Sequence, residues 1–518
     1  MSAPAPWTRP DPFARVNLGR LLGSAGDPDR IALVEDALSG PRTRWTAAML
    51  DAEIEALAAG LLARGLVRGD RVGVLAANSA RQVALYFGAM RAGLVIVPVN
   101  WKLPAQTVGY ILADAGTALV FADAERMALV PPGADAIAID GAAWDRFLVR
   151  GRTVEPVDPE RDEIAQILYT SGSTGRPKGV PLSHAGQYWA CAAVTRADNR
   201  HHRILVAAPM YHMNALFNLK FAFLNGATVI LQRGFTADAF LAAIVEERAT
   251  WLSGVPTMFA LLAARVGDGP APEAFAGVTR IFMGSSPFSN DLLARVKALF
   301  PNAVVTNGYG TTEAGPAVFG PMPDGSPPPD GSLGVAVPGS EVRIVGEDGR
   351  PLEGEAVGVL EMRNPATMSG YLNRPDKTAA ALTPDGWYHS GDVVRRDAAG
   401  VLWFVGRADD MFVCGGENVW PAEVEKRLEA HPDVDQAVVV PIPDPVKQAL
   451  PVAFVVPRAG ARLTSEEVKR HAIATGPAYA HPRHVFLVEA IPLAGTNKID
   501  RAALARDAAG RAGTAGRP

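Results

Sequence analysis

Apolar residues follow two kinds of pattern in the first part of the chain. Over residues 47–64 they recur at helical spacing and stop at Gly65, a residue typical of a helix C-cap. Short, mainly apolar runs at 71–75, 94–98 and 118–121 predict strands. Strands that alternate with helices are typical of an α/β fold built on a parallel sheet. We therefore predict a large α/β N-terminal domain of parallel-type sheets with helices.

Four later apolar runs each lead into a turn that is rich in glycine and polar residues. These runs cover residues 164–169, 204–207, 280–283 and 304–306. In doubly wound sheets, ligands bind at the carboxyl ends of the strands. We therefore expect the turns after these runs to converge on one binding cleft.

The pattern changes after residue 339, where short runs at 341–345, 358–362 and 402–405 predict a small β subdomain. From residue 409 the order of elements is mixed, as in an α+β domain. We predict helices at 421–428 and 465–474, strands at 436–441 and 452–456, and a frayed end from about Asp507. The predicted domains are therefore residues 1–408 and residues 409–518.

Composition narrows the class of protein. The 518 residues are 48% hydrophobic and 20% charged, which is ordinary for a soluble globular enzyme. The net charge of −4 argues against a nucleic-acid partner, since such proteins usually present a basic face. Cys191 and Cys414 are too few for a disulfide framework, and Met1–Pro12 lacks the apolar core of a signal peptide. No apolar stretch reaches the roughly 20 residues of a membrane span. We expect a cytoplasmic enzyme, and its oligomeric state is not predicted.

The strand predicted at 164–169 leads into a loop rich in glycine and hydroxyl residues. Glycines let backbone amides point inward, hydroxyls add donors, and Lys178 adds a positive charge, so the loop suits a phosphate group. Its spacing fits neither the Walker pattern nor the dinucleotide-binding pattern. The alternative is a flexible turn, but the Pro-Lys-Gly end favours a phosphate site. The predicted phosphate-binding residues are Thr170, Ser171, Gly172, Ser173, Thr174, Gly175 and Lys178.

Two further stretches suggest the rest of a nucleotide. Glu313 ends a glycine-rich stretch and offers a carboxylate for magnesium beside a triphosphate, while Tyr309 offers a flat face for a purine. The alternative for this stretch is a turn with a solvated glutamate. Asp392 has two oxygens for the hydroxyls of a ribose, although a lone Ser-Gly-Asp is more often a simple turn.

Together these stretches resemble the motifs of the adenylate-forming enzymes, the superfamily of acyl-CoA synthetases, firefly luciferase and peptide-synthetase adenylation domains. The resemblance covers roughly residues 30–505, with the motifs in family order. It implies that Tyr309 stacks on adenine and that Thr312 and Glu313 meet phosphate and metal. It also implies that Asp392 and Arg407 hold the ribose and that Asp409 is a domain hinge. Further nucleotide contacts are implied for Asn307, Gly308, Gly310 and Thr311.

The C-terminal motifs of the resemblance concern the thiol and the catalytic lysine. Gly415, Gly416 and Glu417 match the segment that lines the pantetheine tunnel, where a side chain at Gly416 would block the thiol. Cys414 is not expected to be a nucleophile, because no activating partner is evident. Lys498 matches the catalytic lysine, and Asn497 stands where a typical member has glycine.

The same resemblance predicts the acyl pocket. His212 is expected beside the carboxylate and the thiol entry, although a lone histidine is more often a core residue. The pocket is expected to be largely apolar with two amides and an open floor at Gly310, which suits a substituted aromatic acid first, and a medium-chain or dicarboxylic acid second. Its predicted lining is Met213, Asn214, Phe217, Asn218, Gly284, Ser285 and Gly310.

Four other polar residues receive no role in the site. We expect Lys220 to be solvated, although it is long enough to pair with a second carboxylate. His201 and His202 are expected on the surface, and His184 as no more than a helix cap.

The implied enzyme is an ATP-dependent carboxylic acid–CoA ligase that uses magnesium. A carboxylate would attack the α-phosphate of ATP, and coenzyme A would then displace AMP from the acyl-AMP intermediate. The alternatives are an acyl-AMP ligase that serves a carrier protein, a fatty-acid–CoA ligase for a longer chain, and a catalytically inactive nucleotide-binding module. Nothing in the sequence supports a luciferase-type oxygenase.

Overall fold

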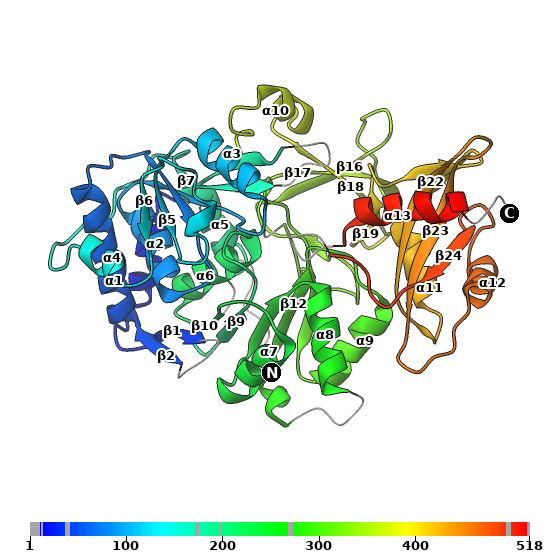
Figure 1. Cartoon of the computed structure of the whole chain (residues 1–518), viewed down its shortest axis with the longest axis horizontal. Helices are drawn as coiled ribbons and strands as arrows, with labels where there is room; N and C mark the ends of the chain where they lie inside the picture. The colour runs from blue at the N-terminus through cyan, green and yellow to red at the C-terminus, as the bar shows by residue number, and fades with distance from the viewer. Residues whose placement is uncertain are drawn as a thin grey trace. The chain divides into compact units, whose positions relative to one another are not determined.

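The structure is a computed structural model that describes residues 11, 14–36, 42–170, 176–195, 198–267, 273–316, 318–493 and 499–514. The chain divides into two compact units, whose elements are labelled in Figure 1. The first comprises Met1–Ser285, Leu299–Val342 and Glu361–His389, and the second comprises Ser286–Ala298, Arg343–Leu360 and Ser390–Pro518. The predicted α/β fold is confirmed, while the functional boundary at residue 409 stays a prediction.

The first unit contains a six-stranded sheet in the order β6-β5-β3-β4-β7-β8. Its neighbouring strands are parallel except for the antiparallel hairpin β7–β8. An apolar cluster that includes Leu75, Val97, Val120 and Ile167 packs beneath it. The strands are β3 (Arg71–Leu75), β4 (Val95–Pro98), β5 (Thr117–Ala122), β6 (Ala136–Ala138), β7 (Ile164–Thr170) and β8 (Lys178–Ser183).

The same unit contains a seven-stranded sheet in the order β13-β12-β11-β9-β10-β1-β2. All its neighbours are parallel except β1 and β2, which are antiparallel. Parallel strands place their carboxyl ends at one edge, which is where the glycine-bearing turns follow. The strands are β1 (Ile31–Asp36), β2 (Thr43–Thr46), β9 (Arg203–Val206), β10 (Thr228–Gln232), β11 (Trp251–Gly254), β12 (Arg280–Gly284) and β13 (Val304–Gly308).

Helices connect the strands of both sheets. Ser79 is the N-cap of helix α2 and accepts a hydrogen bond from the Gln82 amide. The helices are α1 (Ala47–Ala63), α2 (Ala80–Arg91), α3 (Ala105–Ala115), α4 (Ala142–Phe147), α5 (His184–Ala192), α6 (Met213–Asn225), α7 (Ala237–Glu246) and α8 (Pro256–Val266), with 3₁₀ turns at Leu18–Ala25, Met127–Leu129 and Glu273–Gly277. The unit also holds the strands β14 (Phe319–Gly320) and β15 (Val335–Ala336) and the helix α10 (Pro375–Ala381).

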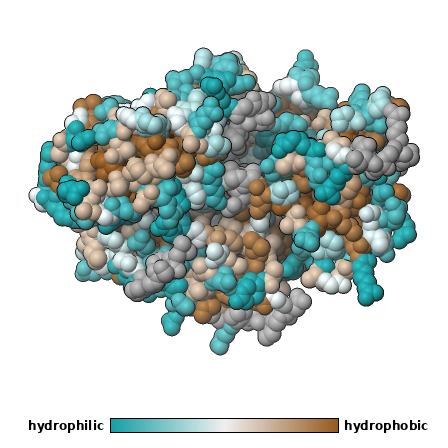
Figure 2. Space-filling model, in the orientation of Figure 1, coloured by the Kyte–Doolittle hydropathy of each residue, from teal (hydrophilic) through white to brown (hydrophobic). Residues whose placement is uncertain are grey.

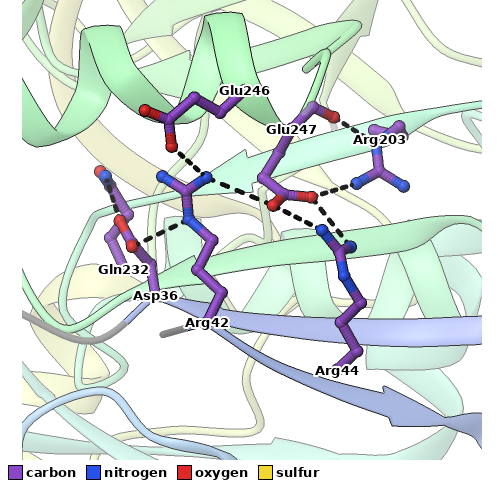
Figure 3. A network of polar contacts seen from close by, with 7 residues as sticks. All are labelled: Asp36, Arg42, Arg44, Arg203, Gln232, Glu246 and Glu247. Carbon is purple, nitrogen blue, oxygen red and sulfur yellow. Dashed lines mark hydrogen bonds and ion pairs between the residues drawn. The ribbon is translucent and has the colours of Figure 1, made fainter. Parts of the chain in front are cut away.

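An ion-pair network ties β2 to the start of β9 and the end of α7. Figure 3 shows Arg42, Arg44 and Arg203 pointing toward the carboxylate of Glu247, whose side chain is only 4% exposed. The shortest distances to the Glu247 oxygens are 3.3 Å from Arg42, 2.8 Å from Arg44 and 2.7 Å from Arg203. Burial raises the pKa of Glu247, but the hydrogen bond from Arg44 and the charges of Arg44, Arg203 and Arg42 outweigh it and hold the pKa below its ordinary value.

A four-stranded sheet in the order β16-β17-β18-β19 contains residues of both units. Its strands are β16 (Glu341–Val345), β17 (Ala356–Arg363), β18 (Tyr388–Arg396) and β19 (Leu402–Arg407). The sequence alone favoured a turn around Asp392, but this residue lies inside β18 and pairs with Arg407 on β19. The turn interpretation is therefore wrong, because pairing with a distant strand extends the backbone there.

The second unit ends in a sheet of order β21-β20-β23-β22, with β24 paired to β23. Its elements are β20 (Phe412–Cys414), β21 (Glu417–Val419), β22 (Val434–Asp444), β23 (Gln448–Pro457), β24 (His484–Leu487), α11 (Pro421–Glu429), α12 (Ser465–Thr475) and α13 (Arg501–Thr514), with α9 (Asn290–Leu299) almost wholly in this unit. The expected fraying from Asp507 is wrong. Helix α13 continues to Thr514 because Leu504 and Ala508 are buried against the apolar cluster of β22 and β23.

Hydrophilic and hydrophobic residues are interspersed over the face shown in Figure 2. Among the described residues, no helix combines the length and the apolar character that crossing a membrane requires.

Candidate active site

The predicted phosphate loop joins the two strands of the β7–β8 hairpin. Thr170 is the last residue of β7 and Lys178 the first of β8, and the two are ladder partners. Residues 171–175 lie outside the described residues, so the predicted roles of Ser171, Gly172, Ser173, Thr174 and Gly175 stay predictions. The hairpin register nevertheless fixes both ends of the loop at the carboxyl end of β7, where Thr170 pairs with Lys178.

Glu313 is a buried carboxylate that faces hydroxyl groups. Its residue is 8% exposed, and one carboxylate oxygen accepts a hydrogen bond from the Tyr371 hydroxyl at 2.9 Å and from the Thr170 hydroxyl at 3.4 Å. No arginine, lysine or histidine of the described residues forms an ion pair with it. Thr312 precedes it, and Thr311 shapes the turn by accepting from the Ala314 amide at 2.9 Å. The predicted phosphate and magnesium residues Thr170 and Glu313 are thus brought together.

Tyr371 belongs to this site, although sequence reasoning missed it. Its ring is stacked under the Lys178 ammonium, 4.1 Å from the ring centroid, while its hydroxyl holds Glu313. The Leu372 amide donates to the Gly179 carbonyl at 2.9 Å and so fixes the segment on β8. No charged residue occurs between 367 and 373, so the sequence contains no chemical signal that would have identified the tyrosine.

The stretch from Asn307 to Gly310 is shaped by close packing. Asn307 donates to the Gly331 carbonyl at 3.1 Å, and the Tyr309 ring lies 5.4 Å from the Phe319 ring centroid. A Cβ atom at Gly308 would lie 2.0 Å from the Phe282 ring. Glycine at this position therefore allows the Phe282 ring to pack directly on the backbone.

Gly284, Ser285 and Gly310 also have tight surroundings. A Cβ atom at Gly284 would lie 1.9 Å from the Gly308 carbonyl oxygen, and one at Gly310 would lie 2.7 Å from Pro316 Cα. Ser285 adopts a left-handed φ of 69°, which is rare for a residue with a side chain and is often found at functional sites. The open pocket floor at Gly310 stays a prediction, but a tryptophan there would displace backbone and so could not test it cleanly.

The predicted ribose residues form an ion pair in the second unit. Arg407 donates to Asp392 at 3.0 Å and to the predicted hinge residue Asp409 at 2.9 Å. Burial lowers the pKa of Arg407, but the hydrogen bond to Asp409 and the charges of Asp392 and Asp409 raise it above its ordinary value. Asp392 is 6% exposed, and its amide donates to the Ser390 hydroxyl at 3.0 Å. The carboxylate is thus held in a fixed position.

The predicted tunnel glycines form the turn of the β20–β21 hairpin. Gly415 and Gly416 have left-handed φ values of 64° and 89°, and a Cβ atom on either would contact nothing within 4 Å. Glycine is therefore required here by backbone conformation, and its role in thiol passage stays a prediction, as does that of Glu417, the first residue of β21. Cys414 is buried, in agreement with the expectation that it is not a nucleophile.

Lys498 lies outside the described residues. The residues that flank this segment, Leu493 and Ile499, form an antiparallel bridge. The ends of the segment are therefore held, and the catalytic role of Lys498 stays a prediction.

Helix α6 carries the predicted acyl-pocket residues directly after His212, which is its N-cap residue. Asn214 donates to the Ser253 hydroxyl oxygen at 2.9 Å, and Asn218 donates to the same oxygen at 3.2 Å. Phe217 is 9% exposed and packs near Phe221, with ring centroids 6.0 Å apart. Met213 begins the helix.

Lys220 was expected in solvent, and that expectation is wrong. It is fully buried and donates to the Gln187 side-chain oxygen at 2.6 Å. Burial lowers the pKa of Lys220 to about 8. Its neighbours on α5 are far away in the sequence, so the local pattern gave no sign of this environment.

Two of the three histidine expectations are also wrong. His202 is 2% exposed, and burial lowers its pKa to about 3, whereas His201 is exposed as expected. His184 is buried and accepts a hydrogen bond from the Leu18 amide at 3.1 Å, while Ser183 caps the helix. Burial lowers the pKa of His184 to about 4.

The β7–β8 hairpin and Glu313 in the first unit, and the Asp392–Arg407 pair in the second, are the features that the resemblance to adenylate-forming enzymes predicted. The family model of the AMP-binding enzymes matches residues 23–372, and the model of the AMP-binding enzyme C-terminal domain matches residues 423–498. The chain belongs to the AMP-binding enzyme family.

Relatives and solved structures agree with this class. The chain is 34% identical over 468 residues to a feruloyl-CoA synthase of an Amycolatopsis species, covering 88% of this chain and 92% of the relative. It is 33% identical over 469 residues to the fatty acid–acyl-carrier-protein ligase ScoC of Streptomyces coeruleorubidus, covering 87% and 89%. The crystal structure of ATP-bound MatB from Rhodopseudomonas palustris matches with a TM-score of 0.86 and 27% identity, covering 95% of this chain and 99% of that one. The predicted enzyme class, an AMP-forming acid–thiol ligase, is confirmed.

Proposed function

We propose that this chain joins an aromatic or medium-chain carboxylic acid to coenzyme A, with cleavage of ATP to AMP and pyrophosphate. One observation carries the proposal most strongly. Glu313 is buried, faces hydroxyl groups and lacks an ion-pair partner among the described residues, while Thr170 at the end of the phosphate loop is its neighbour. A carboxylate in this setting is suited to bind a hard cation that accompanies a triphosphate.

Magnesium fits the residues that are present. The described part of the chain holds no group of three or more histidine, cysteine, aspartate or glutamate residues that would bind a metal on their own. A magnesium ion held by Glu313 would therefore take further oxygen ligands from the nucleotide and from water, as Mg²⁺ commonly does. When bound, the ion would neutralise charge on the phosphate oxygens.

The first half-reaction is the formation of acyl-AMP. A carboxylate oxygen of the acid attacks the α-phosphorus, and the bond from that phosphorus to the leaving pyrophosphate breaks. Phosphoryl transfer depends mainly on positioning and on cancelling negative charge on the phosphoryl oxygens. Lys178 and Lys498 supply that charge, Tyr309 stacks on the adenine, and the Asp392–Arg407 pair holds the ribose.

The second half-reaction is thioester formation. The C-terminal domain turns about Asp409, which withdraws Lys498 and brings the Gly415–Gly416 turn to the thiol path. The thiolate sulfur of coenzyme A attacks the acyl carbon, and AMP leaves with the carboxylate oxygen that had attacked phosphorus. Gly416 has open space where a Cβ atom would stand, in agreement with a path that needs room.

The test is pyrophosphate release across a panel of carboxylic acids, measured with and without coenzyme A. We expect release with at least one aromatic or medium-chain acid, and a thioester product only when coenzyme A is present. Absence of pyrophosphate with every acid, from a folded protein with ATP and magnesium, would disprove the proposal.

Lys498→Ala separates the two halves of the reaction. Acyl-AMP formation should fall at least about 100-fold, because a preorganised charge in the transition state is lost. Thioester formation from supplied acyl-AMP should continue at near the wild-type rate. Equal loss of both halves would contradict the assigned role of Lys498.

The second candidate function is transfer of the acyl group to a carrier protein, favoured by the similarity to ScoC. Incubation of the enzyme, ATP and acid with either coenzyme A or a phosphopantetheinylated carrier protein distinguishes the two acceptors. We expect faster thioester formation on free coenzyme A, and a preference for the carrier protein would replace our proposal with this second one.

A further inference from the structure

Three polar side chains meet in a buried position between α6 and β11. Ser253 is 1% exposed and Asn218 is 3% exposed. The Ser253 oxygen accepts hydrogen bonds from Asn214 at 2.9 Å and from Asn218 at 3.2 Å, and Asn218 also donates to the Asn214 carbonyl oxygen at 2.8 Å. We call Asn214, Asn218 and Ser253 the amide–serine triad.

After the internal bonds are formed, the triad retains two donors, the Ser253 hydroxyl proton and the second amide proton of Asn214, and one acceptor, the Asn218 side-chain oxygen. The Ser253 oxygen already accepts two hydrogen bonds, so its hydroxyl proton needs an acceptor, and none occurs among the described residues. The Asn218 side-chain oxygen receives no hydrogen bond from the part of the chain that the structure describes, and it is not among the fully buried atoms that lack a partner. Buried polar groups are nearly always paired, because leaving one unpaired destabilises the folded protein. A ligand group that both accepts and donates would satisfy the Ser253 hydroxyl and the Asn218 oxygen.

The triad lies next to the residues predicted to surround the acyl group. Ser253 is the ladder partner of Phe282 on β12, and the Phe282 ring lies against the backbone of Gly308. Helix α6 brings Asn214 and Asn218 to the same side of the sheet, with Phe217 between them in sequence. The buried phenylalanines Phe217 and Phe221 lie on the same helix as the two asparagines.

We propose that the acid carries a hydroxyl group remote from its carboxylate, and that the amide–serine triad recognises this group. The Ser253 hydroxyl donates to the oxygen of the ligand, and the ligand hydroxyl donates to the side-chain oxygen of Asn218. Ser253 and Asn218 are therefore specificity-determining residues. This inference rests on the proposed function, since it assumes that the acid occupies the pocket beside α6.

The experiment compares pairs of acids that differ only in this hydroxyl. Suitable pairs are 4-hydroxycinnamate with cinnamate, and 8-hydroxyoctanoate with octanoate, each assayed by pyrophosphate release. For at least one pair, wild-type kcat/KM should favour the hydroxy acid by about 100-fold or more, because a site built to bond a hydroxyl rejects the analogue that lacks it. Ser253→Ala should reduce this preference to below about tenfold by lowering kcat/KM for the hydroxy acid alone.

Three further variants distinguish loss of recognition from an effect on folding. Ser253→Cys retains the side-chain volume with only a weak donor, so it should lose most of the preference at an unchanged melting temperature. Asn218→Ala should lose it as well, whereas Asn225→Ala, on the same helix but bonded to Thr195 and Phe221, should retain it. Equal changes for both members of a pair would show a purely structural triad and overturn the inference.

The inference would also be overturned if wild-type kcat/KM differed by less than threefold between the two members of every pair. If no acid releases pyrophosphate, the proposed function fails, and calorimetric binding of the same acids decides the inference separately. The hydroxy acid must then bind at least tenfold more tightly to the wild type than to Ser253→Ala, and equal binding would reject it.

Discussion

Glu247 and Glu313 are two buried carboxylates of the same unit, and their surroundings are opposite. Three arginines contact Glu247, whose side chain is 4% exposed. Glu313 is 8% exposed and receives two hydroxyl hydrogen bonds, with no cationic side chain paired to it among the described residues. Burying a charge is costly unless it is compensated. The protein itself compensates Glu247, whereas we propose that a bound ion compensates Glu313.

Glu247 and Glu313 are both buried, so burial does not distinguish them. The kind of partner does, and we propose that it distinguishes a structural carboxylate from a functional one. Arginine forks occupy both oxygens of Glu247 and leave little room for another ligand. Hydroxyl donors, in contrast, orient one oxygen of Glu313 without neutralising its charge. The following predictions test this distinction, in order of decreasing effect.

Glu313→Gln should lower acyl-AMP formation by at least about 100-fold, because the charge that would hold magnesium is removed. The melting temperature should stay within about 2 °C of the wild type, since no ion pair is broken. Pyrophosphate release and differential scanning fluorimetry measure the two quantities. A variant with normal activity would place the metal elsewhere.

Glu247→Gln should have the reverse effect. Removing the shared partner of three arginines should lower the free energy of unfolding by about 2 kcal/mol, less than for a fully buried pair because Arg44 is half exposed. Adenylation at 25 °C should remain near the wild-type rate. Urea denaturation measures the loss, and a large fall in activity without unfolding would contradict the structural role of Glu247.

Tyr371→Phe should weaken the apparent affinity for magnesium about tenfold, because one hydrogen bond to a charged group is worth roughly 1.5 kcal/mol. The phenylalanine ring retains the contact with Lys178, so the change isolates the hydroxyl. The magnesium dependence of pyrophosphate release gives the affinity, and calorimetric titration of magnesium with ATP gives a readout apart from activity. Lys178→Met is the companion variant that removes the ammonium and leaves the hydroxyl in place.

The smallest effect concerns acid stability. The pKa of Glu247 is held below its ordinary value of 4.5, so its stabilising contribution is complete above about pH 4.5 and is lost as the pH falls through the folded-state pKa. The difference in unfolding free energy between wild type and Glu247→Gln should therefore shrink below pH 4.5. Urea denaturation from pH 7 to pH 3.5 measures it, and a constant difference would mean that the carboxylate does not titrate with folding.

The motifs at 164–178 and 307–313 could be identified from the sequence because each combines residue types that suit one ligand. A strand, a glycine-rich turn and a charged group lie within a few residues of each other, so local chemistry is sufficient. The parallel strands were readable for the same reason, since apolar runs and helical spacing are local patterns. Tyr371 could not be identified from the sequence, because its hydrogen bond to Glu313 joins residues that are 58 positions apart.

Sequence patterns were sufficient to identify the family and the alternation of strands and helices, and they predict the chemical groups of the nucleotide site. Only the tertiary structure decided that Lys220 and His202 are buried, that Asp392 lies in a strand, and that Glu247 rather than Glu313 is neutralised by arginines. The physical reason is that a side chain's charge and hydrogen-bonding capacity are local properties, whereas its burial and partners depend on segments distant in the sequence. Glu247 and Glu313 therefore differ only in the residues that surround them in the folded protein.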